Sequence, residues 1–362
     1  MNKRLADLRA KLDQQGLDGL LITRPENLYH LSGFGGGEYL DATMLVSADE
    51  AWISTDSRYY EDVKQRAPDF KLFEAGYDRN KALGEFAAIA KPKTMGFEIS
   101  HLTVGTFKDW SKAARKAGFK LKPALDLVEE LRIVKTPDEL DKIKRAVKLT
   151  DEAFAHFCSV VKPGMTEKEC AWVIEKYMRE NSADKTAFDL IVASGPNGAL
   201  PHAITGERKL QTGEPIVVDI GCRIEHYHSD LTRTIILGKS DQQFDKVYKT
   251  VLKAQETAEK RIKAGIKGKR ADALARNVIE KADYGQYFGH GLGHGVGLAV
   301  HEGPRASKLS KDVYRAGMTL TIEPGIYIPG WGGVRIEDLV VIGETGVTIL
   351  SQASKEPVVR SQ

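Results

Sequence analysis

The sequence has few of the features that mark membrane or disulfide-rich proteins. It holds three cysteines, Cys158, Cys170 and Cys222, too few and too odd in number for a disulfide framework. We therefore expect free thiols in a reducing cytoplasm. No stretch approaches the roughly 20 apolar residues that a membrane span needs. The first residues, MNKRLADLRAKLDQQG, lack the apolar core of a signal peptide, so we expect a cytoplasmic protein with no membrane contact.

A marked excess of one charge is also missing. Lys and Arg number 53 and Asp and Glu number 50, which gives a net charge of +3. Phosphate binding needs clustered positive charge, so this balance argues against nucleic acid as a partner. Hydrophobic residues make up 42% and charged residues 28%, which is typical of a globular protein with a sizeable core.

The length predicts two domains. A helix near residues 2–15 and short apolar segments at 20–22, 44–46 and 94–97 indicate alternating helices and strands. This alternation is typical of a small α/β domain, which we place at residues 1–127.

The second domain is placed at residues 128–362. Thr136-Pro137-Asp138-Glu139 combines a capping threonine, a proline at the first helical position and a glutamate three residues after the cap. It predicts the start of a long helix, and Thr166 with Glu169 repeats the pattern. Strands dominate from about residue 186, with a helical interval near 241–282.

Four acidic residues stand within or beside apolar segments that read as strands: Asp219, Asp230, Glu323 and Glu337. Burying an unpaired carboxylate costs several kcal/mol, roughly, unless it is protonated, paired or bound to metal. A salt bridge explains any one of them equally well, but four need a shared counter-charge. Arg233 and Arg335 are too few to balance four acids, so metal is the better interpretation.

A turn separates the first two acids. Gly221 and the polar run 223–226 lie between Asp219 and Asp230. We expect a hairpin that brings both carboxylates close together.

A glycine-rich segment at 288–297 holds His290 and His294 among five glycines. The spacing imitates a helical zinc motif, but each helical glycine costs roughly 1 kcal/mol relative to alanine. A phosphate loop is a second alternative, but no amphipathic helix follows the segment. Close approach of the backbone to a metal or substrate explains the glycines better.

Four carboxylates and one imidazole form an oxygen-rich ligand set. It suits two divalent ions such as Mn²⁺ or Co²⁺, and Zn²⁺ or Fe²⁺ is also compatible. Two such ions, about 3.5–4 Å apart, lower the pKa of a shared water towards roughly 7 and polarise a carbonyl group. The arrangement therefore favours hydrolysis.

The order Asp219, Asp230, His294, Glu323 and Glu337 resembles the ligand series of the pita-bread metallopeptidases. Within this family, the chain is similar to the prolidase (Xaa-Pro dipeptidase) and Xaa-Pro aminopeptidase branch. The segments that carry the resemblance are Asp-Ile-Gly (219–221), Tyr-His-Ser-Asp-Leu-Thr-Arg-Thr (227–234), Gly-His-Gly-Leu-Gly-His (289–294), His-Glu-Gly-Pro (301–304), Thr-Ile-Glu-Pro-Gly-Ile-Tyr (321–327), Val-Arg-Ile-Glu-Asp (334–338) and, near the N-terminus, 16–22, 29–34 and 55–59.

The resemblance implies an α/β creatinase/prolidase-like N-terminal domain, an α+β catalytic domain with the pita-bread fold, and a homodimer. It also implies the metal roles. Asp219 would chelate one ion, His294 and Glu323 the other, and Asp230 and Glu337 would bridge both. Glu323 would also act as general base towards the water.

The resemblance further implies side chains around the substrate, namely His202, His290, His301, Arg305, Tyr327 and Arg335. His202 would stabilise the tetrahedral intermediate, and His290 and His301 would either support the metal ligands or hold the substrate. Arg335 would orient a bridging carboxylate, supported by Tyr327. Arg305 would contact the carboxylate of a dipeptide.

Two segments depart from the family pattern. Ala299 stands where many relatives have an acidic residue, which alters the charge expected in the pocket. The loop 32–39 reads Ser-Gly-Phe-Gly-Gly-Gly-Glu-Tyr instead of the commoner Thr-Gly-Phe pattern. In the family this loop approaches a partner subunit's active site, so it bears on the preferred substrate length.

The leading hypothesis is hydrolysis of the bond before proline in dipeptides or short peptides. This bond is a tertiary amide without an N–H group, so peptidases that bind their substrates through a hydrogen bond from that N–H cannot form it here. An Xaa-Pro aminopeptidase acting on longer peptides is the alternative. A methionine aminopeptidase shares the ligand set but not the extra N-terminal domain. A non-catalytic binding module is disfavoured because all five ligands are present.

Overall fold

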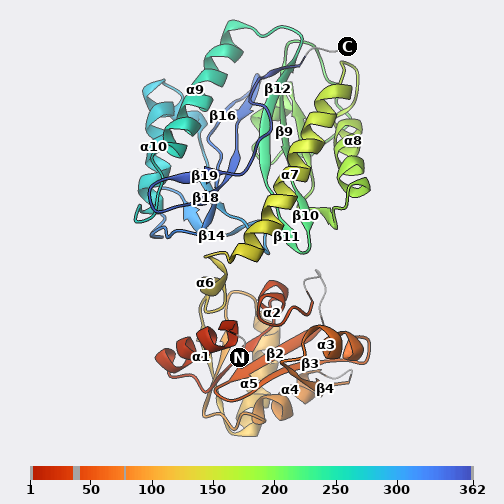
Figure 1. Ribbon diagram of the computed structural model, residues 1–362, viewed down its shortest axis with the longest axis vertical. Helices are drawn as coiled ribbons and strands as arrows, with labels where there is room; N and C mark the ends of the chain where they lie inside the picture. The colour runs from red at the N-terminus through yellow and green to blue at the C-terminus, as the bar shows by residue number, and fades with distance from the viewer. Residues whose placement is uncertain (1–2, 36–40, 77–78, 360–362) are drawn as a thin grey trace. The chain divides into compact units, whose positions relative to one another are not determined.

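The structure is a computed structural model that describes residues 3–35, 41–76 and 79–359. It divides the chain into two compact units, Met1–Arg132 and Ile133–Gln362 (Figure 1). The domain boundary expected after residue 127 stays a prediction. Part of the loop 32–39, residues 36–39, lies outside the described residues. Over the described ranges, no helix combines the length and the apolar character needed to cross a membrane.

The first unit is built on a six-stranded sheet in the order β4-β3-β2-β1-β5-β6. Strand β2 is antiparallel to both β1 and β3, and the other neighbouring strands are parallel. The strands are β1 (Gly19–Ile22), β2 (Ala42–Ser47), β3 (Ala51–Thr55), β4 (Lys71–Glu74), β5 (Thr94–Glu98) and β6 (Lys120–Ala124). The helices are α1 (Lys3–Gln15), α2 (Pro25–Ser32), α3 (Tyr60–Arg66), α4 (Arg79–Ala88), α5 (Val104–Ala117) and α6 (Glu129–Arg132).

Helices cover both faces of this sheet (Figure 1). Successive strand residues point to opposite faces, and the packing follows this alternation. Leu20 and Ile22 pack with α1, α2 and α3, whereas Leu21 and Leu45 pack with α4 and α5. The first unit is therefore the α/β domain that the sequence predicts.

The second unit combines several small sheets with two pairs of helices. Its helices are α7 (Pro137–Val160), α8 (Glu167–Glu180), α9 (Gln242–Glu259) and α10 (Gly268–Lys281). Its longer strands are β8 (Ile191–Ser194), β9 (Pro215–Ile220), β12 (Leu231–Leu237), β14 (Glu302–Ala306), β15 (Thr319–Ile322), β16 (Gly325–Ile328), β17 (Gly332–Arg335) and β18 (Asp338–Ile342). The shorter ones are β7 (Lys185–Thr186), β10 (Cys222–Ile224), β11 (Tyr227–His228), β13 (Gly293–Gly295), β19 (Val347–Ile349) and β20 (Val358–Val359).

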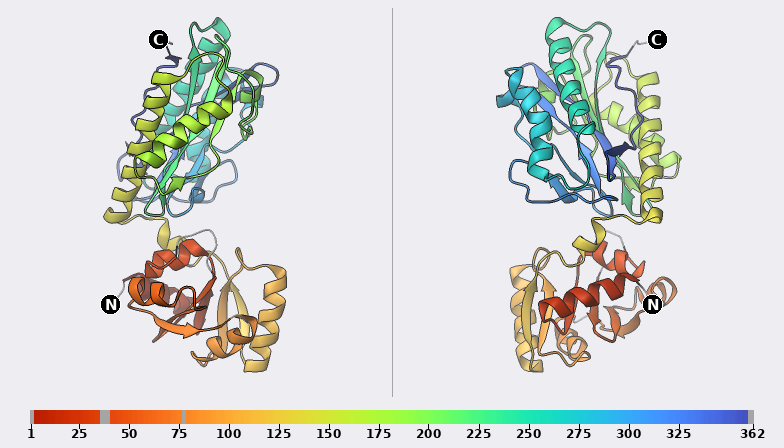
Figure 2. Two further views of the ribbon diagram at one scale, coloured as in Figure 1. Left: turned by 90° about the vertical axis from the view of Figure 1, so that its right-hand side faces the viewer. Right: turned by 60° about the vertical axis from the view of Figure 1, so that its left-hand side comes forward.

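Each helix pair packs on its own set of strands. Helices α7 and α8 bury their apolar side chains against β8, β9 and β12, while α9 and α10 pack against β15 to β18. Figure 2 shows the two pairs on opposite sides of the strands. The strand ends that carry the candidate ligands lie between these two layers.

Local sequence signals explain where the long helices begin. Thr136 accepts a hydrogen bond from the backbone N–H of Glu139, and the Glu139 carboxylate accepts one from the backbone of Thr136. Thr166 and Glu169 form the same capping box at α8. Both predicted helix starts are therefore confirmed.

The expected hairpin is also present. Strand β9 pairs antiparallel with β12, and Asp219 lies opposite Thr232. The polar run between them forms the short pair β10–β11. The pairing brings Asp219 and Asp230 to the same end of the sheet, as predicted. All three cysteines are free, in agreement with the expected thiols.

Candidate metal centre and active site

One cavity of about 540 Å³ in the second unit gathers the candidate residues. All eleven side chains singled out in the sequence line it, although they come from segments up to 135 residues apart (337 − 202 = 135). They are His202, Asp219, Asp230, His290, His294, His301, Arg305, Glu323, Tyr327, Arg335 and Glu337.

The four acids reach the cavity from strand ends. Asp219 lies within β9, Asp230 directly precedes β12, Glu323 directly follows β15, and Glu337 directly precedes β18. Only Asp219 is therefore part of a strand. Asp230, Glu323 and Glu337 lie one residue outside a strand, where the regular strand pairing ends, and their side chains line the cavity.

Ligand atoms of Asp230, His294 and Glu337 all lie within 4.8 Å of one another. Nε2 of His294 is 3.6 Å from Oδ2 of Asp230 and 3.4 Å from Oε1 of Glu323. Each of these side chains is largely buried. Nε2 of the imidazole thus faces two carboxylates. Both distances exceed about 3.2 Å, the upper limit for the donor–acceptor distance of a good N–H···O hydrogen bond.

Burial and mutual repulsion disfavour the charged carboxylates. Burial, reinforced by Glu337, Asp219 and Glu323, holds the pKa of Asp230 well above its usual range. Burial raises the pKa of Glu323 to about 7, and it also raises that of Glu337, with the charge of Glu323 next in importance. Burial lowers the pKa of His294 to about 3, which keeps it neutral, as a metal ligand must be.

The residues fit divalent cations. Oδ1 of Asp219 is buried and accepts no hydrogen bond from any residue within the described ranges. A buried acceptor without a partner costs about 1–3 kcal/mol, and a bound divalent cation would satisfy this atom. Oxygen donors with one neutral imidazole are the set that Mn²⁺ and similar ions accept.

Arg335 joins several site residues. Its Nη2 lies 2.7 Å from Oδ2 of Asp219, and its Nη1 donates to the hydroxyl of Tyr327 at 2.8 Å. The same hydroxyl lies 2.8 Å from Nε2 of His290. Arg335 was expected to orient a bridging carboxylate. Its ion pair goes to Asp219, and its Nε donates to the hydroxyl of Thr232, which in turn donates to Glu337. Its role towards a bridging carboxylate stays a prediction. A chain of contacts also leads from Asp219 through Arg335 and Tyr327 to His290.

Two threonines support candidate ligands, and the sequence reasoning missed both. Thr232 donates its hydroxyl to Oε2 of Glu337 at 2.7 Å, and Thr321 donates to Oε1 of Glu323 at 3.0 Å. Thr321 also accepts the backbone N–H of His294 at 3.0 Å. Thr321 lies two residues before Glu323, on the same side of an extended chain, and that spacing was the available signal for it. Thr232 supports Glu337, which lies 105 positions away, so no local signal could have found it.

The glycine-rich segment forms strand β13 and not a helix, as expected. Its glycines, however, serve contacts between backbones. A Cβ on Gly293 would lie 1.9 Å from the carbonyl oxygen of Thr321, and one on Gly295 would lie 2.0 Å from that of Gly303. We expected the glycines to let the backbone approach a metal or substrate. At Gly293 and Gly295 they instead let it pack closely against the backbones of β15 and β14.

A buried ion pair on α10 holds the start of the same segment. Arg276 binds Asp272 through two nitrogens, at 2.7 and 2.9 Å, and donates to the carbonyl oxygens of Phe288 and His290. Asp272 accepts the backbone N–H of Leu292. The backbone on both sides of His290 is thereby fixed, which the sequence did not reveal.

The outer part of the cavity is more open. His202, His301 and Arg305 are exposed there, and the ring of His301 lies 4.3 Å from that of His294, edge to face. Burial lowers the pKa of His301, and the charge of Arg305 acts in the same direction. Further lining residues that the sequence did not single out are Phe188, Asp189, Ile191, Pro201 and Ser307.

Comparison with known proteins identifies the architecture. Residues 141–344, more than half of the chain, match metallopeptidase family M24. The chain belongs to this family. Residues 4–134 match the creatinase/prolidase N-terminal domain. The M24 assignment confirms the resemblance seen in the sequence, and with it the pita-bread fold of the second unit and the activity of a metallopeptidase.

Relatives of this M24 chain match over nearly its whole length. The Xaa-Pro dipeptidase of Pyrococcus furiosus is 37% identical, over 98% of this chain and 99% of the relative. A solved Xaa-Pro dipeptidase from Bacillus anthracis has 35% identity and a TM-score of 0.94, covering 99% of each chain. A solved X-Pro aminopeptidase from Thermotoga maritima has 36% identity and a TM-score of 0.86, covering 97% of this chain and 99% of that one.

Proposed function

We propose that this protein hydrolyses the peptide bond before proline in Xaa-Pro dipeptides. The observation that carries the proposal is the convergence of four carboxylates, His294 and Arg305 on a single cavity. It is supported by full-length similarity to Xaa-Pro dipeptidases. The substrates are dipeptides or short peptides that contain proline, and the working form is a homodimer.

Two divalent ions, Mn²⁺ or Co²⁺ with Zn²⁺ or Fe²⁺ also compatible, would be held by five side chains: Asp219, Asp230, His294, Glu323 and Glu337. When bound, such ions lower the pKa of a coordinated water and polarise the scissile carbonyl. Two observations support this assignment: Oδ1 of Asp219 is buried and has no hydrogen-bond partner among the described residues, and the pKa values of Asp230 and Glu337 are raised.

Glu323 is the proton carrier. Its Oε1 accepts the hydroxyl of Thr321, whereas its Oε2 makes no hydrogen bond with a residue inside the described ranges. Oε2 takes the proton that the attacking water loses and delivers it to the proline nitrogen. That nitrogen has no hydrogen of its own in the peptide, so it leaves as a secondary amine only after receiving one.

The exposed residues position the substrate. His202 donates a hydrogen bond to the oxygen of the tetrahedral intermediate, the kind of contact that stabilises developing charge. His301 lies beside His294 and holds the substrate backbone, and His290 is fixed by Tyr327. Arg305 binds the carboxylate of the dipeptide, because its guanidinium matches a carboxylate in shape and charge.

A comparison of substrate lengths tests the proposal. The protein, dialysed and then supplied with Mn²⁺ or Co²⁺, is assayed with Leu-Pro and with Leu-Pro-Gly. Faster cleavage of the dipeptide is expected because only its carboxylate lies next to the proline ring. Equal or faster cleavage of the tripeptide would indicate an aminopeptidase, the activity named for the Thermotoga maritima structure. Arg305→Ala should weaken dipeptide cleavage much more than tripeptide cleavage.

A further inference from the structure

Arg233 is a buried arginine beside the candidate ligand Glu337, yet it does not line the cavity. Its side chain is 1% exposed, and its Nη2 lies 2.7 Å from Oδ1 of the equally buried Asp338. Its Nη1 donates to the main-chain carbonyl oxygens of Thr232 and Glu337. The charge of Arg233 is thus paired with Asp338, and the carboxylate of Glu337 remains available for a cation.

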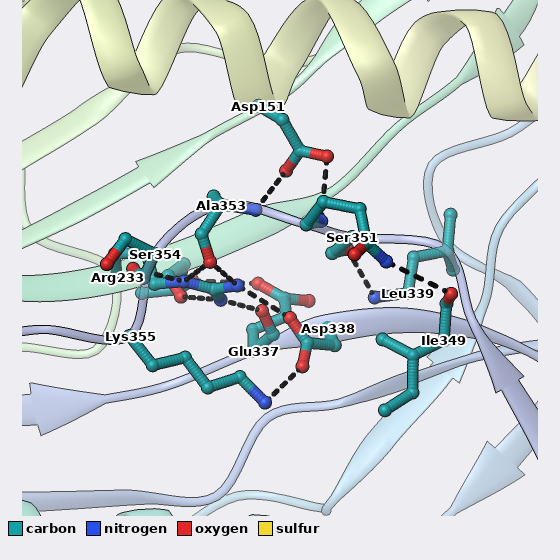
Figure 3. Close-up of polar contacts among 12 residues, drawn as sticks. Asp151, Arg233, Glu337, Asp338, Leu339, Ile349, Ser351, Ala353, Ser354 and Lys355 are labelled. Carbon is teal, nitrogen blue, oxygen red and sulfur yellow. Dashed lines mark hydrogen bonds and ion pairs between the residues drawn. The ribbon is translucent and has the colours of Figure 1, made fainter.

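The same guanidinium also holds the C-terminal segment 351–355. Nε lies 3.2 Å from the carbonyl oxygens of Ala353 and Ser354, and Nη2 lies 2.9 Å from that of Ala353. Arginine has five N–H donors, and here every nitrogen has an acceptor. Figure 3 shows Arg233 between this segment and the residues Glu337 and Asp338.

The segment is fixed from its other side as well. Asp151 on α7 accepts the backbone N–H groups of Gln352 and Ala353, at 2.8 and 2.9 Å. The hydroxyl of Ser351 accepts the N–H of Leu339 at 3.0 Å, and Lys355 lies 2.5 Å from Oδ2 of Asp338 (Figure 3). The segment is therefore tied to α7, to β18 and, through Arg233, to β12.

Glu337 depends on these contacts for its position. It directly precedes β18, whose ladder partners are β15 and β19, whereas β12 belongs to another sheet. Its backbone N–H donates to the carbonyl oxygen of Thr232 at 3.0 Å, and its own carbonyl oxygen accepts from Arg233. Both sides of its backbone are thus held by two consecutive residues of β12.

We propose that Arg233 is a positioning residue for the metal ligand Glu337, and that it couples this ligand to the C-terminal segment 351–355. The proposal rests on the proposed function, in which Glu337 binds metal. Groups that orient metal ligands typically change metal affinity about 10- to 100-fold when they are removed. Arg233 holds the backbone of Glu337, so removing the arginine side chain should mainly lower the affinity for metal.

The test measures Mn²⁺ binding to the metal-free, full-length protein by calorimetry. Arg233→Met should weaken Mn²⁺ binding about 10- to 100-fold. Arg233→Lys should lose less Mn²⁺ affinity, because lysine keeps the positive charge that pairs with Asp338. Some loss remains because lysine lacks the planar guanidinium that bonds several carbonyl oxygens at once. Asp151→Asn, which weakens the hold on the C-terminal segment and removes a negative charge near Arg233, should also weaken binding. With saturating Mn²⁺, kcat should fall while KM for Leu-Pro changes little.

The matched control is Arg132→Met, which removes an arginine of similar burial, 4% exposed, from the other unit. It should lower the melting temperature and leave Mn²⁺ affinity unchanged. Mn²⁺ affinity equal to the parent's in Arg233→Met would overturn the proposal. If that variant does not fold, parental affinity in both Arg233→Lys and Asp151→Asn overturns it. A parent protein that binds no Mn²⁺ would instead contradict the proposed function.

Discussion

The Nη2 atom of Arg335 lies 2.7 Å from Oδ2 of Asp219, and the other oxygen of that carboxylate is buried without a hydrogen bond to any described residue. The guanidinium also contacts Tyr327 and, through Nε, the hydroxyl of Thr232 at 3.0 Å. One planar group therefore sets the direction of Asp219 and leaves one oxygen for a cation.

Arg335→Lys tests this arrangement. Lysine keeps the positive charge but cannot hold Asp219, Tyr327 and Thr232 at once, because it lacks the planar fork. We expect kcat/KM for an Xaa-Pro dipeptide to fall about 10- to 100-fold, as for other groups that orient ligands. Metal content after dialysis should fall with it. Parental values for both quantities would show that charge alone is sufficient.

Thr321 links two ligands, so its hydroxyl should matter more than its size suggests. Thr321→Val keeps the shape but removes the donor to Glu323 and the acceptor for the N–H of His294. Leaving a buried N–H unpaired costs about 1–3 kcal/mol, so we expect a lower melting temperature and weaker metal binding. Thr321→Ser should restore both. A serine variant no better than valine would argue against the hydrogen bonds.

The sequence predicts the ligand set better than it predicts the support of the ligands. Asp219 and Glu337 stand out because charged residues beside apolar strands need a reason to be there, and that signal is local. The contacts of Arg233 join residues more than 100 positions apart, and no local pattern encodes them. Several helices and strands of the fold follow from capping boxes and apolar segments, which are also local signals.

The glycine-rich segment shows the same limit. Its glycines correctly exclude a helix, but the sequence does not reveal what approaches Gly293 and Gly295. The answer, backbone carbonyls from Thr321 and Gly303, depends on how β13 pairs with distant strands. In the same way, the partner of Arg335 could be assigned to Asp219 only from the three-dimensional packing.

Glu98 in the first unit should make stability depend on pH. Burial raises its pKa above the ordinary value of 4.5, against the opposing hydrogen bonds from Asn27, Thr23 and Arg24. The folded state therefore binds more protons at this group than the unfolded state, and its contribution to stability falls as pH rises from about 4.5. Glu98→Gln removes this titration. The difference in melting temperature, Glu98→Gln minus parent, should be larger at pH 8 than at pH 5. The same difference at both pH values would contradict the prediction.

Asp189 should influence which residue is accepted before proline. It lines the cavity next to Phe188, is exposed, and has no ion-pair partner within the described ranges. Exposed ion pairs contribute about 0.2–1 kcal/mol, so Asp189→Asn should lower the kcat/KM ratio of Lys-Pro to Met-Pro by a factor between about 1.4 and 5. Asp189→Lys should favour Glu-Pro. A ratio that does not change in either variant would exclude Asp189 from substrate selection.

The central claim is that Asp219, Asp230, Glu323 and Glu337 share divalent cations instead of finding separate basic partners. It is tested most directly by removing metal with a chelator and measuring Leu-Pro hydrolysis before and after Mn²⁺ is restored, in the parent and in Asp230→Asn. We predict that the parent loses its activity and regains it with two equivalents of Mn²⁺, while Asp230→Asn stays inactive. Undiminished hydrolysis by the chelated parent, or parental activity in Asp230→Asn, would contradict the claim.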